Sequence, residues 1–301
     1  MDKPKNKFWQ NVKASAKAAP KLFAFYVILR TLVIGIMIAQ ILNRDYNNVL
    51  MCVLTLVLFT LPTFVERRIK IDIPNTLEAI ILLFIFSAEI LGEIREFYIN
   101  VPGWDTMLHT INGFLCAAIG VAMIDILNKH ERFSIKLSPI FVALVAFCFS
   151  MTIGVLWEFY EYFSDILLRT DMQKDTFVNT IRTVSLHPDG KNIPVAIRGI
   201  SDTLINYTQN DAPATATFNG YLDIGLLDTM KDLLVNFIGA VVFSVIGYFY
   251  TKNSASGKNS RFVRRFILTR IHDEIPGDSE RQILSAHSAD TESSGKSDAP
   301  G

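Results

Sequence analysis

The chain has 301 residues, of which 50% are hydrophobic and 19% charged, and its mean hydropathy is +0.31. A soluble domain usually has about 25% charged residues, so the composition leans towards a membrane protein. The 29 basic and 29 acidic residues cancel, so net charge gives no argument for a nucleic-acid partner. The three cysteines form no C-x-x-C pair, which excludes a disulfide framework and a cysteine-type zinc site.

Long apolar blocks dominate the chain, and six of them approach the roughly 20 residues that a helix needs to cross a bilayer. They must be helical, because lipid offers the backbone no hydrogen-bond partner. We therefore predict an all-α integral membrane protein, with a six-span membrane domain over residues 22–250. The predicted transmembrane helices are residues 22–42, 48–65, 74–94, 106–128, 139–164 and 225–250, the second being short and containing Pro62.

Basic residues gather in four places: before the first span, after the second, after the fourth and after the sixth. With six spans, all four clusters lie on one side, and the positive-inside rule makes that side cytoplasmic. We expect a protein of the cytoplasmic membrane (inner or plasma) with both termini inside. Residues 1–21 are then a basic cytoplasmic N-terminus, and residues 251–301 form a cytoplasmic tail that is first basic, then polar to acidic and disordered.

Two segments lie outside the predicted bilayer. Residues 166–223 form the largest extracytoplasmic connection, and the Pro-Asp-Gly sequence at 188–190, followed by alternating apolar residues, predicts a small β-hairpin cap. In the tail, residues 260–271 predict a basic amphipathic helix that contacts anionic lipid. The alternative for this stretch is a plain positive-inside stop signal.

Ionisable side chains occur inside four of the predicted spans, although each costs roughly 2.5–3.5 kcal/mol at the centre of a bilayer. Spans three and five run outward and spans four and six run inward, so these side chains share one depth at the outer face. They and their polar or aromatic neighbours are Glu89, Glu93, Trp104, Asp105, His109, Trp157, Glu158, Glu161, Asp165, Asp228, Lys231, Asp232 and Asn236.

Helical spacing arranges these residues as stripes. Asp105 and His109 are four residues apart and share one helix face, as do Asp228 and Asp232. One imidazole with several carboxylates suits a divalent cation: zinc, manganese, magnesium or iron. The predicted metal ligands are Asp105, His109, Glu158, Glu161, Asp228 and Asp232. The predicted supporting residues are Glu89, Glu93, Trp104, Trp157, Asp165, Lys231 and Asn236.

Other interpretations of the same residues stay open. Without a cation, several carboxylates would be protonated, and they would then be able to relay protons. Asp105 and Asp228 lie in the first turn of their helices, where the helix dipole favours a carboxylate without any function. The tryptophans fit an aromatic belt at the interface, and Lys231 fits a structural ion pair.

A short motif, D-x-x-K-D-x-x-V-N, occurs twice, at residues 171–179 and 228–236. The first copy lies at the start of the predicted cap and the second carries Asp228 and Asp232. If the repeat is meaningful, the start of the cap loop folds over the same site.

Three elements resemble the YjdF-like family of bacterial integral membrane proteins, over roughly residues 80–250. Asp105 to His109, followed by Gly113, resembles its D-x-x-x-H…G element, and residues 157–162 resemble its Y-E-x-x-E-W element. Residues 228–232, followed by Gly-Ala at 239–240, resemble its W-D-T-x-x-D…G-A element, with leucine replacing the tryptophan. The family is functionally uncharacterised, so the resemblance implies a fold and a residue set but no reaction.

Our leading hypothesis is a metal-dependent hydrolase or transferase acting on a lipid or envelope-precursor substrate at the outer leaflet, since a bound cation can activate water. The alternative is a cation- or proton-coupled transporter, which needs polar groups that continue to the cytoplasmic side. There the sequence offers little beyond Arg30, Glu78 and Asp125. A third class is a non-catalytic scaffold or sensor whose cap binds a partner and whose basic tail binds anionic lipid.

Overall fold

The structure is a computed structural model that describes residues 17, 19–69, 71–128, 137–254 and 269–270. The predicted basic N-terminus and the predicted disordered tail lie almost wholly outside the described residues.

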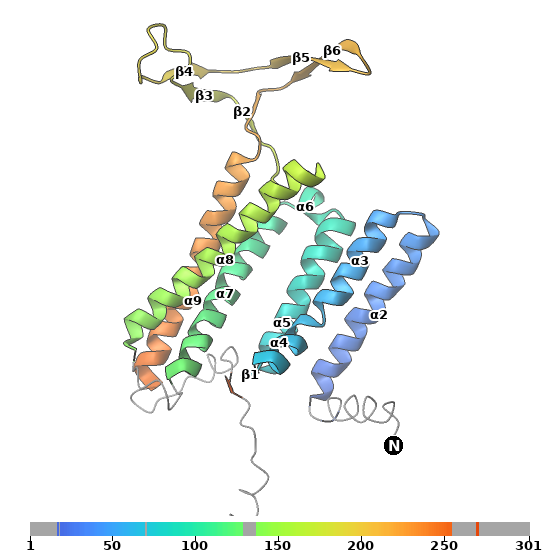
Figure 1. Cartoon of the computed structure of the whole chain (residues 1–301), viewed down its shortest axis with the longest axis vertical. Coiled ribbons are helices and arrows are strands. Elements are labelled where there is room, and N and C mark those ends of the chain that lie inside the picture. Colours follow the sequence, from blue (N-terminus) through green and yellow to red (C-terminus); the bar gives the residue numbers. More distant parts are fainter. Residues whose placement is uncertain (1–16, 18, 70, 129–136, 255–268, 271–301) are drawn as a thin grey trace, which may run out of the picture.

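Helices make up most of the described chain and stand side by side (Figure 1). They are α2 (Pro20–Leu42), α3 (Tyr46–Leu58), α4 (Leu61–Ile69), α5 (Asn75–Phe86), the π-helix η1 (Ser87–Ile94), α6 (Phe97–Asn100), α7 (Trp104–Asn128), α8 (Pro139–Leu168) and α9 (Leu226–Ser254). They pack in two groups. The first contains α2, α3, α5 and η1, and the second contains α7, α8 and α9.

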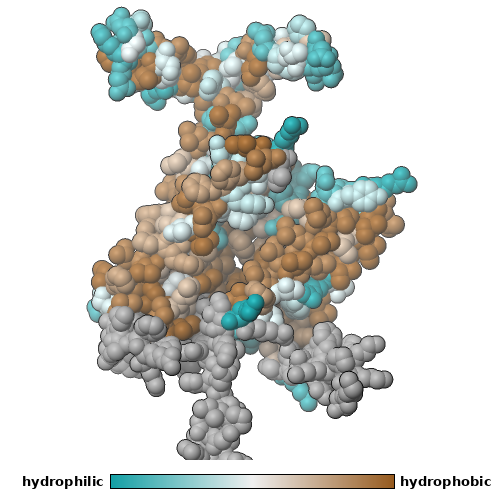
Figure 2. Space-filling view, viewed as in Figure 1, coloured by the Kyte–Doolittle hydropathy of each residue, from teal (hydrophilic) through white to brown (hydrophobic). Residues whose placement is uncertain are grey.

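Within the described residues, five helical segments are long and apolar enough to cross a membrane. They are Pro20–Leu42, Tyr46–Glu66, Trp104–Leu127, Pro139–Leu167 and Leu226–Asn253. Figure 2 shows hydrophobic side chains covering the outer face of both helix groups, as lipid contact requires. The prediction of a mostly helical membrane protein is confirmed at this level, whereas the sixth span and the orientation stay predictions.

The predicted third span, residues 74–94, is built in two parts. The α-helix α5 runs directly into the π-helix η1, and together they carry Glu78, Glu89 and Glu93. The wide π turn closes with a hydrogen bond from the Arg95 amide to the carbonyl oxygen of Ile90, at 3.0 Å. Glu96 then adopts a left-handed φ of 56°, which ends the helix.

The predicted second span is also divided, into α3 and α4. Pro62 lies in the first turn of α4 and has no amide hydrogen with which to continue the hydrogen bonds of α3.

The basic tail helix predicted over 260–271 lies outside the described residues, except at its end. There Thr269–Arg270 form strand β8, which pairs antiparallel with β1 (Ile71–Asp72), so the helix prediction is wrong for these two residues.

Helices α7 and α9 approach each other closely through two glycines. A Cβ atom at Gly113 would collide with the backbone oxygen of Asn236, and one at Gly239 would collide with the backbone oxygen of Thr110. Small residues allow such approach between membrane helices, where no hydrophobic effect drives association. Helix α8 joins this pair through the Ser150 hydroxyl, which donates to the Gly113 carbonyl at 2.7 Å.

Strands occupy most of the connection between α8 and α9 and lie beyond the ends of these helices (Figure 1). They are β2 (Phe177–Val178), β3 (Thr180–Thr183), β4 (Val195–Arg198), β5 (Thr203–Gln209), β6 (Ala212–Phe218) and β7 (Tyr221–Leu222). Three antiparallel pairs form: β2 with β7, β3 with β4 and β5 with β6. The β5–β6 hairpin, which the sequence analysis did not predict, turns at Asn210 and Asp211, both at positive φ as a type I′ turn requires.

The glycine contact between α7 and α9 predicts a sensitive position. We expect Gly113→Ala to lower the free energy of unfolding by about 1–3 kcal/mol, because the added methyl group has no space. Thermal unfolding in detergent would measure this. The control is Gly35→Ala on α2, where no described atom beyond the chain neighbours and the helix's own backbone lies within 4 Å of the new methyl group. Alanine favours a helix by about 1 kcal/mol over glycine, so this variant should be as stable as the wild type or slightly more stable. Equal melting temperatures for the two variants would contradict the packing described here.

Candidate functional site

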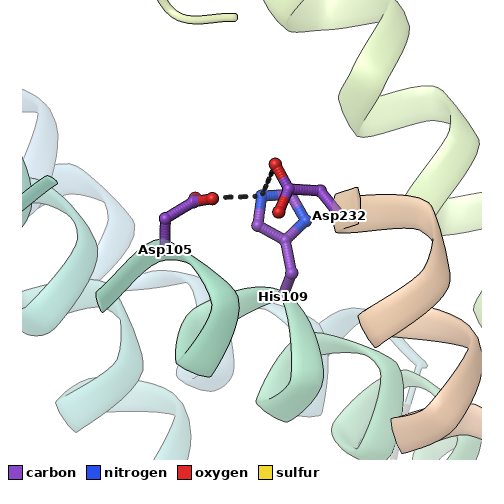
Figure 3. Close-up of side chains that lie close together, drawn as sticks. All are labelled: Asp105, His109 and Asp232. Atoms are coloured by element: carbon purple, nitrogen blue, oxygen red, sulfur yellow. Dashed lines mark ion pairs between the residues drawn. The ribbon is translucent and has the colours of Figure 1, made fainter. Parts of the chain in front are cut away.

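His109 is the centre of a polar cluster formed by α7, α8 and α9. Its Nε2 atom lies 3.3 Å from Asp105 Oδ1 and 3.9 Å from Asp232 Oδ2 (Figure 3). Its Nδ1 atom lies 3.8 Å from Glu158 Oε1. Four of the six residues that the sequence proposed as ligands therefore meet here: His109, and the three carboxylates of Asp105, Glu158 and Asp232 around its ring.

The spacing of the helices explains how these side chains meet. Asp105 and His109 are one turn apart on α7, so both point from the same face. Asp232 lies on α9, which the glycine contacts hold against α7. Glu158 lies on α8, on the turn before Glu161, and both of these glutamates are buried.

Burying the charged side chains of this cluster costs free energy unless their charges are neutralised or hydrogen-bonded. The side chains of His109, Glu158 and Asp232 are 8%, 5% and 2% exposed. Neither oxygen of Glu158, nor Oδ1 of Asp232, has a hydrogen-bond partner in the part of the chain that the structure describes. Thr229 lies beside Glu158, but its geometry does not complete a hydrogen bond. A buried carboxylate without partners costs several kcal/mol, so the site calls for a further cation or for protons.

Lys231 supplies part of that positive charge. Its Nζ atom lies 2.8 Å from Asp228 Oδ1, 3.5 Å from Asp105 Oδ2 and 3.6 Å from Asp232 Oδ1. The four carboxylates of the cluster, those of Asp105, Glu158, Asp228 and Asp232, thus face one lysine and one histidine. With every carboxylate ionised and the imidazole protonated, the cluster has a net charge of −2, and a neutral imidazole makes it −3.

Three of these residues also lie close enough together to be candidates for holding a metal ion. One ligand atom each from Asp105, His109 and Asp232 lies within 4.8 Å of the other two. Two ligand atoms that each lie about 2.1 Å from one ion are at most about 4.2 Å apart. Both carboxylate distances from His109 Nε2, 3.3 Å and 3.9 Å, fall within that limit.

The position of Glu158 adds to this geometry. Metal-binding histidines generally donate their second ring N–H to a carboxylate or carbonyl oxygen, which fixes the tautomer and the ring orientation. Glu158 lies on the Nδ1 side of His109, while the two aspartates lie on the Nε2 side. Nε2 is therefore the nitrogen that faces the two aspartates, and Nδ1 is the nitrogen that faces Glu158.

Asp228 and Asp165 hold the start of the strand-rich connection. Asp228 Oδ2 accepts a hydrogen bond from the backbone amide of Lys174 at 2.9 Å. Asp165 accepts hydrogen bonds from the backbone amides of Met172, at 2.6 Å, and Gln173, at 2.9 Å. The segment that carries the first copy of the repeated motif therefore lies over the second copy, as the repeat predicted.

The remaining predicted residues make no ion pair with His109 in the described structure. Glu161 Oε1 accepts a hydrogen bond from Trp157 Nε1 at 2.7 Å. Trp104 packs edge-on against Phe97, with ring centroids 5.0 Å apart. Glu89 and Glu93 lie on the π-helix η1, and Asn236 is fully buried one turn after Asp232.

Two residues near the cluster were missed by the sequence analysis. Asn112 Nδ2 donates to Asn236 Oδ1 at 3.2 Å, and its place one turn after His109 on α7 was the readable signal. Tyr98 of α6 packs its ring where Gly92 leaves room for it. Burial raises the pKa of the Tyr98 phenol, and the negative charge of Glu93 raises it further. No sequence period marks Tyr98, because α6 has only four residues.

Fold and site together define a helical membrane protein that crosses the bilayer several times and holds a buried carboxylate–histidine cluster. Over residues 24–253 the chain matches the family described as predicted membrane protein (DUF2238), and it belongs to that family. This is the YjdF-like family, so the resemblance found in its motifs is confirmed.

The chain is also similar to an uncharacterized protein of Thermotoga maritima. It is 28% identical over 107 residues, which make up 36% of this chain and 53% of that protein. The match therefore spans about half the length of this curated relative. No solved structure matches the chain.

The hydrogen bonds to Asp165 predict how the connection is held over the cluster. We expect Asp165→Ala to speed hydrogen exchange at the amides of Met172 and Gln173 by about tenfold or more, because a hydrogen bond to a charged group contributes roughly 1.5–3 kcal/mol. Hydrogen-exchange mass spectrometry measures this. The control, Asp189→Ala, removes an exposed carboxylate whose ion partner is Lys191, and it should leave both amides unchanged. Unchanged exchange in Asp165→Ala would show that other contacts hold the segment.

Proposed function

We propose that Asp105, His109 and Asp232 bind one divalent metal ion. The observation that carries the proposal is the division of His109 between its partners, with two carboxylates facing Nε2 and the buried Glu158 facing Nδ1. Three oxygens of Glu158 and Asp232 that have no hydrogen bond among the described residues, and the excess of negative charge, support it further. A doubly charged cation would offset that excess, and the ion would hold the three side chains together.

The donor set narrows the choice of metal. One imidazole with carboxylates suits zinc, iron or manganese, whereas magnesium prefers oxygen ligands and keeps several waters. Glu158 Oε1, 3.8 Å from Nδ1, would act through His109 by closing to hydrogen-bond distance and so holding the imidazole in the tautomer that leaves Nε2 free. Asp228 is engaged by Lys174 and Lys231, so we assign it to the connection and to charge balance rather than to the ion.

We further propose that the protein is oriented with both termini in the cytoplasm and that the cluster and its overlying strands face outward. The four basic segments on one side of six spans support this orientation. With this orientation the strands form an extracytoplasmic cap, and a molecule reaches the cluster from the outer leaflet. Lys231 and Asp105, the most exposed members of the cluster at 46% and 25%, mark the accessible side.

The reaction we propose is hydrolysis or group transfer on a lipid or envelope precursor. A bound ion at such a site polarises a phosphoryl or acyl oxygen and lowers the pKa of its water. The protein's own residues would position the substrate, since the Lys231 ammonium group is suited to bind an anionic group at the accessible side. Glu161, held by Trp157, is a second buried carboxylate near the reacting centre and is our candidate for the group that moves a proton.

Proton- or cation-coupled transport is the rival function, and the chain gives it less support. An ion that crosses needs polar groups along the whole path. The sequence has no charged residue in α7 between His109 and Asp125, or in α9 between Asp232 and Lys252. The polar cluster therefore has a charged route on one side only.

The metal proposal predicts a specific order among variants. His109→Ala and Asp232→Asn should each lose bound metal, because each removes one of three ligands. Glu158→Gln should weaken metal affinity by roughly 10–100-fold, as loss of a residue that supports a ligand does. Elemental mass spectrometry on purified protein measures the metal content.

Asp228→Asn is the matched control within the cluster. It removes a carboxylate of the same helix that hydrogen bonds hold away from His109, and it should keep the metal. If both His109→Ala and Asp232→Asn retained metal while still folded, that result would contradict the proposed metal site.

The orientation predicts which surfaces a reagent reaches from outside the cell. A cysteine at Asp189, between β3 and β4, should react on intact cells with a thiol reagent that cannot cross membranes. A cysteine at Asn253, at the end of α9, should react only after the membrane is opened. Both positions are exposed, so burial does not explain a difference between them. The reverse labelling pattern would show the opposite membrane orientation, with the cluster on the cytoplasmic side.

A further inference from the structure

A cavity of about 630 Å³ lies between the first helix group and α7. Along α7 its lining runs from Asn112 to Leu127, and along α5 from Leu77 to Ile85. Apolar side chains form nearly all of this surface, with Asn112 the polar exception at one end. Its volume falls within the roughly 300–1,000 Å³ of typical ligand pockets.

The lining decides what the cavity holds. Ordered water needs two or more polar partners, and only the Asn112 end offers a side chain of that kind. The cavity also lies between helices that span the membrane, where hydrocarbon surrounds the protein. An apolar space of this size left empty is strongly unfavourable, because its walls lose their packing partners. The lining is therefore suited to contact hydrocarbon rather than water.

The polar end of the cavity adjoins the cluster. Asn112 lies three residues after His109 on α7, which is about 4.5 Å along the helix axis. Its amide donates to Asn236, which lies one turn after Asp232 on α9. The polar end of the cavity thus lies about one helical turn from the charged cluster on both α7 and α9.

We propose that this cavity binds the hydrocarbon chain of a membrane lipid whose head group reaches the Asp105–His109–Asp232 cluster. The inference rests on the proposed function and supplies its substrate class: a lipid with a phosphate or ester head group. Lipids on the outer faces of the helices contact exposed side chains, such as Ile38 and Leu144. A chain in the cavity contacts α5 and α7 at the same time, which separates it from the surrounding bilayer.

Photo-crosslinking tests the proposal on the full-length protein in vesicles of phosphatidylethanolamine and phosphatidylglycerol. One probe is phosphatidylglycerol with a diazirine in its acyl chain, and a second has the diazirine in its head group. We expect the acyl probe to label Leu115, Ile119 or Ile81 in the cavity and the head-group probe to label the cluster near Lys231. Labelling on the outer face at Ile38 is the internal reference.

Ile119→Trp fills the cavity and should abolish labelling of the cavity and of the cluster, while labelling at Ile38 is unchanged. The matched control is Leu144→Trp, which adds the same side chain on an outer face of α8. It should leave all labelling as in the wild type. Ile119→Phe serves in place of Ile119→Trp if the larger side chain prevents folding.

Three results would overturn the inference: acyl labelling confined to outer faces, cavity labelling that survives Ile119→Trp, or head-group labelling confined to sites away from the cluster. Metal content measured on the same samples separates this inference from the proposed function. Metal without cavity labelling removes the lipid assignment alone. Cavity and cluster labelling without metal keeps the lipid site and removes the metal.

Discussion

Carboxylates that lie where water does not reach them need positive charge nearby, and this requirement governs the end of the α7–α9 group that adjoins the strands. Glu158 and Asp232 are almost completely buried, and three of their four oxygens lack a hydrogen-bond partner among the described residues. His109 and Lys231 neutralise only part of the negative charge of the cluster. The packing of α7, α8 and α9 forms this cluster, and the connection that carries the strands is held beside it.

The cluster divides into groups with different tasks. The residues around Nε2 of His109 are the ones that we propose as cation ligands. Those that face the connection, Asp165 and Asp228, bind backbone amides and fix the start of the strands. Carboxylates of identical chemistry thus have two tasks, which their hydrogen bonds distinguish and their residue type does not.

Much of this arrangement was predictable from sequence because alternating helix direction fixes depth. That argument places His109, Glu158 and Asp232 at one level without any knowledge of packing. It does not fix how each helix is rotated about its axis. The spans are apolar on nearly every side, so periodicity does not say which face meets a neighbour, and the separation of Asp228 from the imidazole was not readable. The π-helix, the close approach at Gly113 and Gly239 and the placement of Tyr98 depend likewise on contacts between segments distant in sequence.

The two glycines of the α7–α9 contact have a mechanical consequence. Because backbone meets backbone there, with no side chain between them to change rotamer, the two helices are constrained to move as one body. His109 belongs to one of them and Asp232 to the other. Access for the substrate that we propose would therefore depend on η1, α6 or the strand-bearing connection rather than on a separation of α7 from α9. The segments that would control access to the cluster and the glycine contact that sets the distance between His109 and Asp232 are thus separate parts of the chain.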